Sequence, residues 1–178
     1  IHSYSVSKSH ALAKMALLLA LLIVCSQITL PLGPVPLTLQ TLAVLLIGLT
    51  ASPKQAFIVT SLYLVAGLLG LPVFAGFSGG FYALIRPSFG FILGFIPAAG
   101  VGAYYLSAFQ GKKGRSTYYV AALMMTLIIY LVGILYMTGI FNWLQQLNLS
   151  LREIFNLALI PFIPGDVLKA ILACMVAK

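Results

Sequence analysis

Apolar segments cover most of this chain, and they limit its possible folds more than any other feature. A stretch of about 20 apolar residues is long enough to cross a bilayer as an α-helix. The segments run over Ala11–Leu30, Leu37–Ala51, Ala56–Leu71, Phe89–Phe109, Tyr118–Phe141 and Ile163–Ala177. We expect a further short helix over Leu151–Leu159, before the last segment. The sequence therefore predicts an all-α integral membrane protein with six transmembrane helices, forming a single domain over residues 1–178.

The composition argues against a soluble domain. Hydrophobic residues make up 62% of the chain and charged residues only 7%, whereas soluble domains contain about 25% charged residues. The formal net charge of +8 comes from ten basic and two acidic residues. The basic residues are scattered at segment ends and do not form a stripe, so they indicate membrane topology and not nucleic-acid binding.

Basic residues also set the expected orientation, because the cytoplasmic loops of membrane proteins carry an excess of Lys and Arg. With a cytoplasmic N-terminus, seven basic residues lie inside and only Arg86 and Arg152 lie outside. The seven are Lys8, Lys14, Lys54, Lys112, Lys113, Arg115 and Lys178. An even number of helices then places the C-terminus in the cytoplasm as well. The expected outer loops cover residues 31–36, 72–88 and 142–162.

Two opposite charges interrupt the last apolar segment, within Pro161-Phe-Ile-Pro-Gly-Asp-Val-Leu-Lys169. Asp166 and Lys169 are three residues apart and so share one face of a helix. A charge at the centre of a bilayer helix costs about 2.5–3.5 kcal/mol on the translocon scale. Because intramembrane charges usually mark function, we favour a polar site here. The alternative is a structural ion pair that holds helices together or caps this one.

Further polar residues lie at the start of the second apolar segment. Thr38, Gln40 and Thr41 enter the membrane from the same outer side as Asp166 in the predicted topology. Gln40 carries two donors and an acceptor, so it needs partners when it is buried. Together these groups predict an outward-facing pocket for a small molecule that is polar but uncharged or singly charged. Interhelical hydrogen bonding is the alternative explanation of Gln40.

The predicted outer loop 72–88 combines glycines with aromatic residues. Its glycines permit tight turns and a close approach of the backbone to its neighbours. The residues concerned are Gly76, Gly79 and Gly80, with Phe77, Phe81 and Tyr82. This composition fits a lid over the pocket, and equally an interfacial loop that contributes to an aromatic belt.

Motifs for enzymatic chemistry are missing from the sequence. There is no Walker A motif, so we do not expect the chain to hydrolyse ATP. Two acidic residues and two histidines near the N-terminus cannot build a credible metal site. Cys25 and Cys174 are isolated and lack the spacing of a redox pair. We therefore expect no enzymatic activity, no bound metal and no cofactor.

Three blocks of sequence, spread over nearly the whole chain, carry a family resemblance. They are Gly33-Pro-Val-Pro-Leu-Thr-Leu-Gln-Thr-Leu42, Gly79-Gly-Phe-Tyr-Ala-Leu-Ile-Arg-Pro-Ser-Phe-Gly-Phe-Ile-Leu-Gly-Phe95 and Pro161-Phe-Ile-Pro-Gly-Asp-Val-Leu-Lys169. In this order they resemble motifs of the BioY family, the biotin-specific substrate-binding (S) components of energy-coupling factor transporters. The departures are small: Ser88 stands where threonine is often found, and Ser78 where relatives can carry asparagine.

The resemblance implies six transmembrane helices with a biotin pocket near the outer surface. It implies that Asp166 accepts a hydrogen bond from a ureido N–H of biotin, that Lys169 donates to a ligand oxygen, and that Gln40 completes the polar shell. Arg86 is expected to attract the valerate carboxylate. The ligand-binding residues expected on this basis are Asp166, Lys169, Gln40, Thr38, Ser78, Gly79, Tyr82 and Arg86.

The resemblance also implies partners, namely a transmembrane coupling protein and two cytoplasmic ATPase subunits, in a bacterial or archaeal cytoplasmic membrane. In the family, an Ala-x-x-x-Ala motif in the first helix docks the coupling protein. Here Ala16-Leu-Leu-Leu-Ala20 fits this motif, and Ala13 extends the small-residue face. Small faces let helices approach closely, and the alternative is that this face packs inside the chain. The rival functions are an S component for another vitamin and a structural membrane subunit without a ligand site.

Overall fold

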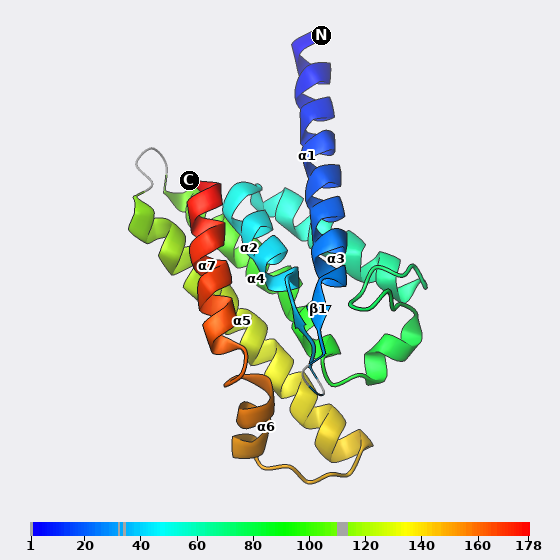
Figure 1. Cartoon of the computed structure of the whole chain (residues 1–178). Helices are drawn as coiled ribbons and strands as arrows, with labels where there is room; N and C mark the ends of the chain where they lie inside the picture. The colour runs from blue at the N-terminus through cyan, green and yellow to red at the C-terminus, as the bar shows by residue number, and fades with distance from the viewer. Residues whose placement is uncertain (1, 32, 34, 110–113) are drawn as a thin grey trace.

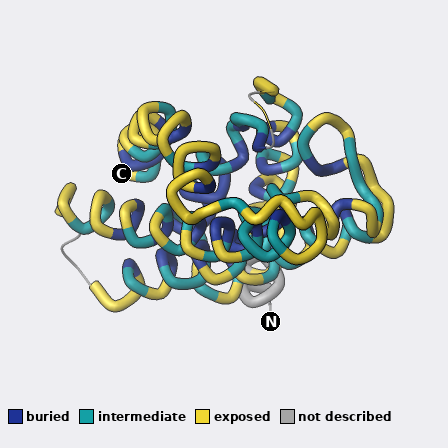
Figure 2. The backbone as a smooth tube through the Cα atoms, turned by 90° about the horizontal axis from the view of Figure 1, so that it is seen from below, coloured by how far each residue is buried: buried dark blue, intermediate teal, exposed yellow. Residues whose placement is uncertain are grey.

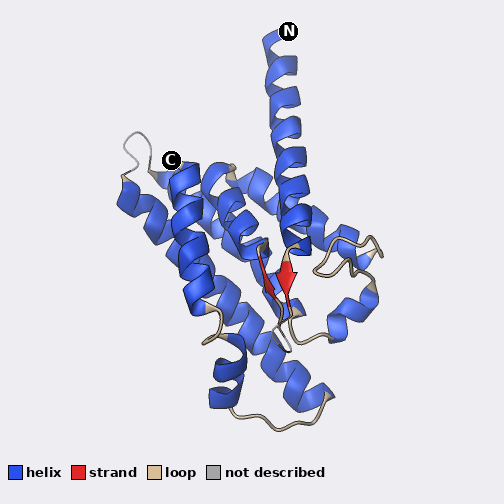
Figure 3. Ribbon diagram, viewed as in Figure 1, coloured by secondary structure: helices blue, strands red, loops and turns tan. Residues whose placement is uncertain are grey.

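The computed structural model describes residues 2–31, 33, 35–109 and 114–178, with side chains from Lys8 onward. Lys112 and Lys113, which we expect on the cytoplasmic side, lie outside the described residues. The described chain is a helical bundle with one short antiparallel ribbon (Figures 1 and 3). The helices are α1 (His2–Gln27), α2 (Gln40–Thr50), α3 (Pro53–Leu68), α4 (Phe89–Ala108), α5 (Arg115–Gly139), α6 (Leu151–Ala158) and α7 (Ile163–Ala177). The shorter elements are β1 (Thr29–Leu30), β2 (Leu37–Thr38), the 3-10 helix η1 (Phe81–Ile85) and the π-helical turn η2 (Ile140–Leu144).

Three helical stretches of the described chain are long and apolar enough to cross a membrane: Lys8–Gln27, Phe89–Ala108 and Arg115–Leu144. α6 and α7 meet at a bend of 52° and together qualify as a fourth crossing. α2 is apolar but has only 11 residues, which gives about 16 Å, roughly half of the hydrocarbon core. The second predicted segment is longer than α2 because Leu37 and Thr38 form β2. The count of six transmembrane helices therefore stays a prediction.

The outward faces of the bundle are apolar, as contact with lipid requires. Leu123, Leu127, Leu131 and Leu135 of α5 are each more than half exposed, and their spacing of four puts them on one side of the helix. Figure 2 shows the exposed positions on the outside of the helices and the buried positions between them. Soluble monomers rarely expose contiguous apolar surface of this kind, so the structure agrees with a membrane protein.

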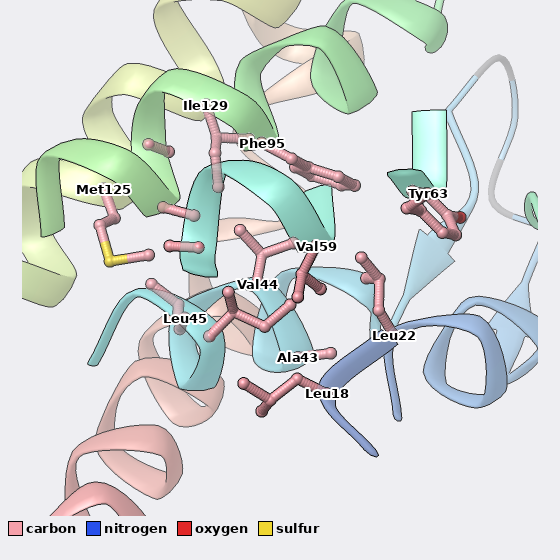
Figure 4. Packing of buried hydrophobic residues seen from close by; sticks show 14 of the residues in the cluster. Leu18, Leu22, Ala43, Val44, Leu45, Val59, Tyr63, Phe95, Met125 and Ile129 are labelled. Atoms are coloured by element: carbon pink, nitrogen blue, oxygen red, sulfur yellow. The ribbon is translucent and has the colours of Figure 1, made fainter. Parts of the chain in front are cut away.

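α2 is the central element of the bundle, since it contacts α1, α3, α4, α5 and α7. Its residues Val44 and Leu45 belong to the main apolar core together with Met125 of α5 (Figure 4). Two glycines make room for the Met125 side chain. A Cβ atom added to Gly48 of α2 or to Gly102 of α4 would come within 2.3 Å of it. The short helix thus reaches its neighbours closely because small residues line the crossing points.

Capping residues explain where two of the helices begin. The Ser52 hydroxyl accepts a hydrogen bond from the Gln55 backbone, and the Gln55 side chain accepts one from the Ser52 backbone, with Pro53 in the first turn of α3. Ser150 and Glu153 form the same reciprocal box at the start of α6. Such boxes satisfy backbone donors that have no partner within the helix.

The two ends of the bundle differ in what they present. The C-terminus lies at the same end as the last turn of α4 and the first turn of α5, whereas α6 and the connection that leads to it lie at the other end (Figure 1). This arrangement is compatible with the predicted loop topology. Which end faces the cytoplasm stays a prediction from the basic residues.

Candidate ligand-binding site

A cavity of about 230 Å³ lies between α2, α4, α5 and α7 and is closed on one side by the segment that joins α3 to α4. Phenyl rings make up much of its wall: Phe74, Phe89, Phe91, Phe95 and Phe162. The polar side chains on the wall are Thr38, Gln40, Thr41, Ser78, Arg86, Ser88, Thr126, Tyr130, Asp166 and Lys169. Six of the eight expected ligand-binding residues therefore meet at one cavity, although their sequence blocks are far apart.

Asp166 and Lys169 form a charged network on this wall. Both lie in the first turns of α7, and Lys169 Nζ is 2.8 Å from Asp166 Oδ1. Thr41 of α2 donates to Asp166 Oδ1 over 3.2 Å and accepts from Lys169 Nζ over 3.0 Å. The Tyr130 hydroxyl of α5 donates to Asp166 Oδ2. The side chains of Lys169 and Asp166 are only 8% and 12% exposed. We call these four residues the charged network.

The charged network keeps unused hydrogen-bonding capacity, and both of its charged residues line the cavity. An ammonium group has three donors, and within the described residues Lys169 uses two of them, in hydrogen bonds to Asp166 and Thr41. A carboxylate offers about four acceptor positions, and Asp166 uses three, for Lys169, Thr41 and Tyr130. One donor on Lys169 and one acceptor position on Asp166 therefore remain within the described residues, on two side chains that are bonded to each other. This pair is complementary to a ligand group that presents an N–H next to a carbonyl oxygen.

A second, neutral network extends from the cavity wall into the core of the bundle. The Gln40 amide nitrogen donates to the Tyr63 hydroxyl over 2.6 Å, and that hydroxyl donates to the Val73 carbonyl over 3.0 Å. Thr38 donates to the Gln40 amide oxygen over 3.0 Å, and Ser26 of α1 donates to the Val73 carbonyl over 2.6 Å. We call these five residues the neutral network. Gln40 thus bonds to another helix and also lines the cavity, so both interpretations of this residue describe part of its environment.

Aromatic rings continue from the neutral network along the cavity. Tyr63 and Phe74 meet edge to face with their centroids 5.4 Å apart, and Phe74 meets Phe89 in the same way at 6.2 Å. Phe91 stands at 87° to the ring of Tyr130, with a centroid distance of 6.3 Å. Edge-to-face contacts of this kind favour fixed ring positions. The cavity therefore has a preformed aromatic wall beside the charged network.

The predicted loop residues are divided between the cavity and the surface. Ser78 and Arg86 line the cavity, and Arg86 donates to the Ser78 hydroxyl over 3.0 Å. The Tyr82 ring is 67% exposed and lies 5.7 Å from the Arg86 guanidinium, outside the cavity lining. Gly79 is also outside the lining: a Cβ atom added to it would lie 2.2 Å from the Leu71 carbonyl oxygen. The missing side chain of Gly79 thus allows loop 72–88 to pack closely against the end of α3.

The expected docking residues lie away from the cavity. Ala13, Ala16 and Ala20 are exposed on α1 and do not line the cavity. The alternative explanation, that this face packs inside the chain, does not describe these side chains. Their exposure leaves the face accessible to another helix.

Two tyrosines that shape the site do not stand out in the sequence. Tyr130 bonds to Asp166, and Tyr63 bonds to Gln40. A tyrosine within an apolar segment is also typical of a membrane interface, so no local pattern marks either residue. The expected lid residues Phe77 and Phe81 are 71% and 69% exposed, whereas Phe74 and Phe89 line the cavity.

Comparisons with known proteins agree on one family. The family model described as "BioY family" matches residues 2–178. A "Probable biotin transporter BioY" from Pyrococcus horikoshii is 38% identical over 172 residues, which is 96% of this chain and 96% of that protein. A "Biotin transporter BioY" from Thermotoga maritima is 33% identical over 166 residues, 93% of this chain and 92% of that protein.

A crystal structure at 2.1 Å of "the S-component for biotin from an ECF-type ABC transporter" superposes with a TM-score of 0.86 and 25% identity, covering 96% of this chain and 90% of that one. The chain belongs to the BioY family.

Proposed function

We propose that this chain binds biotin in the cavity and is the biotin-specific S component of an energy-coupling factor transporter. One observation carries the proposal: within the described residues, the charged network offers one unused donor on Lys169 and one unused acceptor position on Asp166, which are bonded to each other and both line the cavity. The ureido group of biotin presents an N–H next to a carbonyl oxygen. Lys169 then donates to the ureido oxygen, and Asp166 accepts from a ureido N–H. The names of the related proteins and of the solved S component support the same ligand.

The aromatic wall of the cavity suits the ring system of biotin. The faces of this ring system are apolar, and the wall carries the rings of Phe74, Phe89 and Phe91. The Arg86 guanidinium lines the same cavity and is exposed to solvent, so it can attract the valerate carboxylate. The volume of about 230 Å³ lies just below the range of about 300–1,000 Å³ that is typical for drug-sized ligands. The cavity therefore suits a small molecule.

The chain acts in transport and is not an enzyme. We place it in a bacterial or archaeal cytoplasmic membrane with six transmembrane helices, both termini in the cytoplasm and the cavity toward the outside. Energy for uptake comes from two cytoplasmic ATPase subunits through a transmembrane coupling protein. The exposed face of Ala13, Ala16 and Ala20 on α1 supports a close helix contact with that protein.

Ligand titration of the purified full chain in detergent tests this function against its rivals. We expect saturable biotin binding by isothermal titration calorimetry, with no binding of thiamine or riboflavin. Preferential binding of either control vitamin would make the chain an S component for another ligand. Absence of binding by all three would favour a structural subunit in which Asp166 and Lys169 only hold helices.

A further inference from the structure

Tyr63 is the residue at which the neutral network meets the aromatic wall. It lies in the middle of α3 with an exposed fraction of 0% and belongs to the apolar core (Figure 4). It does not line the cavity. It nevertheless contacts two residues that do: its hydroxyl accepts from the Gln40 amide, and its ring meets Phe74 edge to face. Tyr63 thus contacts both a polar residue and an aromatic residue of the cavity wall.

We propose that the Tyr63 hydroxyl is a positioning group for ligand binding, which acts on the ligand through Gln40 and makes no contact with the ligand itself. This inference rests on the proposed function. It adds a residue outside the cavity to the binding machinery and assigns it a role: fixing the orientation of the Gln40 amide.

The geometry of Gln40 explains why the hydroxyl matters. Its amide is held at both ends, because the oxygen accepts from Thr38 over 3.0 Å and the nitrogen donates to Tyr63 over 2.6 Å. The terminal amide torsion has a broad, soft energy profile, so hydrogen bonds decide which edge faces the cavity. Without the Tyr63 hydroxyl, the nitrogen loses its acceptor within the described part of the chain. The amide is then free to turn, and the free energy needed to fix its orientation on binding lowers the ligand affinity.

The other contacts of the Tyr63 hydroxyl are replaceable. The Val73 carbonyl, to which it donates, also accepts from Ser26 over 2.6 Å and from Gln27 over 3.3 Å. Replacing Tyr63 by Phe keeps the ring and its contact with Phe74. The Tyr63→Phe variant therefore isolates the bond to Gln40, and the fold should tolerate it.

A double-mutant cycle separates positioning from general stability. We would measure biotin affinity by isothermal titration calorimetry on the folded, monodisperse fraction of the full chain for Tyr63→Phe, Gln40→Met and the double variant. The matched control is Tyr136→Phe, because the Tyr136 hydroxyl also donates to a backbone carbonyl, that of Leu84, but neither residue lines the cavity. We expect Tyr63→Phe to weaken binding about tenfold, the control less than twofold, and the double variant to match Gln40→Met.

Every outcome decides the question. A loss below twofold in Tyr63→Phe, or losses that multiply in the double variant, would overturn the positioning role while leaving biotin binding by the unaltered chain intact. Failure of the unaltered chain to bind biotin would instead overturn the proposed function. If Tyr63→Phe does not fold, the double variant decides, because removing both partners leaves no buried donor without an acceptor. A folded double variant that binds like Gln40→Met supports the proposal, and a weaker or unfolded one refutes it.

Discussion

The charged network and the neutral network lie against the same cavity but are built differently. The charged network places Asp166 and Thr41 in partly buried positions and leaves one donor and one acceptor unused within the described residues. The neutral network contains Tyr63 and Ser26 at 0% exposure, and the hydroxyl groups of Tyr63, Ser26 and Thr38 all donate to acceptors of the described chain. Within the described residues, Gln40 uses one of its two amide donors, on Tyr63. Unused hydrogen-bonding capacity thus remains on both charged residues of the first network, whereas most of the capacity of the second is used within the chain.

This contrast shows how a small membrane protein can contain two polar clusters for different purposes. A buried donor without a partner costs about 1–3 kcal/mol, so an incomplete network inside an apolar bundle needs a reason. In the proposed function, ligand binding supplies that reason for the charged network. The neutral network has the role of fixing Gln40 and the segment that carries Phe74 if the positioning role proposed for Tyr63 holds.

Removing a charge from the charged network should have the largest effect on biotin binding. Asp166→Asn and Lys169→Met should each weaken biotin binding about 30-fold to several thousand-fold, because losing one partner of a buried charged contact costs about 2–5 kcal/mol. Isothermal titration calorimetry measures the effect, and Lys54→Met, which removes an exposed lysine of α3, serves as the control.

The double variant Asp166→Asn/Lys169→Met distinguishes a site from a structural pair. Removing both charges avoids leaving one buried charge alone, so the fold should recover relative to the single variants while biotin binding stays lost. Near-normal affinity in the folded double variant would contradict the assignment of the charged network to the ligand.

A smaller effect should follow from removing a support of Asp166. Tyr130→Phe deletes the hydroxyl that donates to Asp166 Oδ2, and we expect about a tenfold loss of biotin affinity, in the range for hydrogen bonds to charged groups. The control is Thr126→Val on the same helix. Thr126 also lines the cavity, but its hydroxyl donates to Ala122 within α5. Equal losses in the two variants would show that any change of this wall weakens binding.

Gly79 tests how far the seating of the loop matters. A Cβ atom at this position would meet the Leu71 carbonyl at 2.2 Å, and that backbone cannot move as freely as a side chain. Gly79→Ala should therefore lower the thermal midpoint and weaken biotin binding about threefold to fivefold, since a backbone shift of this kind typically costs about 1–3 kcal/mol in stability. Gly100→Ala is the control, because a Cβ there meets nothing within 4 Å. A wild-type midpoint in Gly79→Ala would show that the loop adapts.

The smallest effect on affinity is expected on α1. Ala16→Trp and Ala20→Trp add bulk to an exposed face, so biotin affinity should stay within about twofold while assembly with the coupling protein is lost. Leu127→Trp is the control, because Leu127 is also exposed, at 59%, but belongs to α5. Co-purification with the coupling protein measures assembly. Intact assembly in both alanine variants would contradict docking on this face.

Local sequence patterns predicted most helix positions. The segment expected over Ile163–Ala177 coincides with α7, and the segment expected from Phe89 begins with α4. Proline and charged residues punctuate these segments, so their ends are encoded locally. The second segment was predicted too long because pairing between Thr29 and Thr38 draws its first residues into a ribbon. That pairing is a contact between distant residues, which the hydrophobic pattern does not encode.

The site was predictable only where its residues break the apolar pattern. Asp166, Lys169 and Gln40 stand out as polar groups in apolar segments, and the structure brings all three to the cavity wall. Tyr130 and Tyr63 do not stand out, because their roles depend on how α5 and α3 are rotated against α7 and α2. The exposed fraction of Phe77 and the burial of Phe74 likewise depend on the path of the loop, in which Phe77 adopts a positive φ of 55°.

The last turn of α1 gives this helix a mechanical connection to the cavity. α1 has 26 residues, about 39 Å of helix, and carries the exposed Ala13, Ala16 and Ala20 near and beyond its midpoint. At its C-terminal end, Gln27 donates to the Phe74 carbonyl over 3.2 Å and accepts from the Phe77 backbone over 2.8 Å. Two hydrogen bonds of Gln27 thus connect the C-terminal end of α1 to the segment that carries Phe74. A tilt of α1 would therefore shift the part of the cavity wall that Phe74 forms.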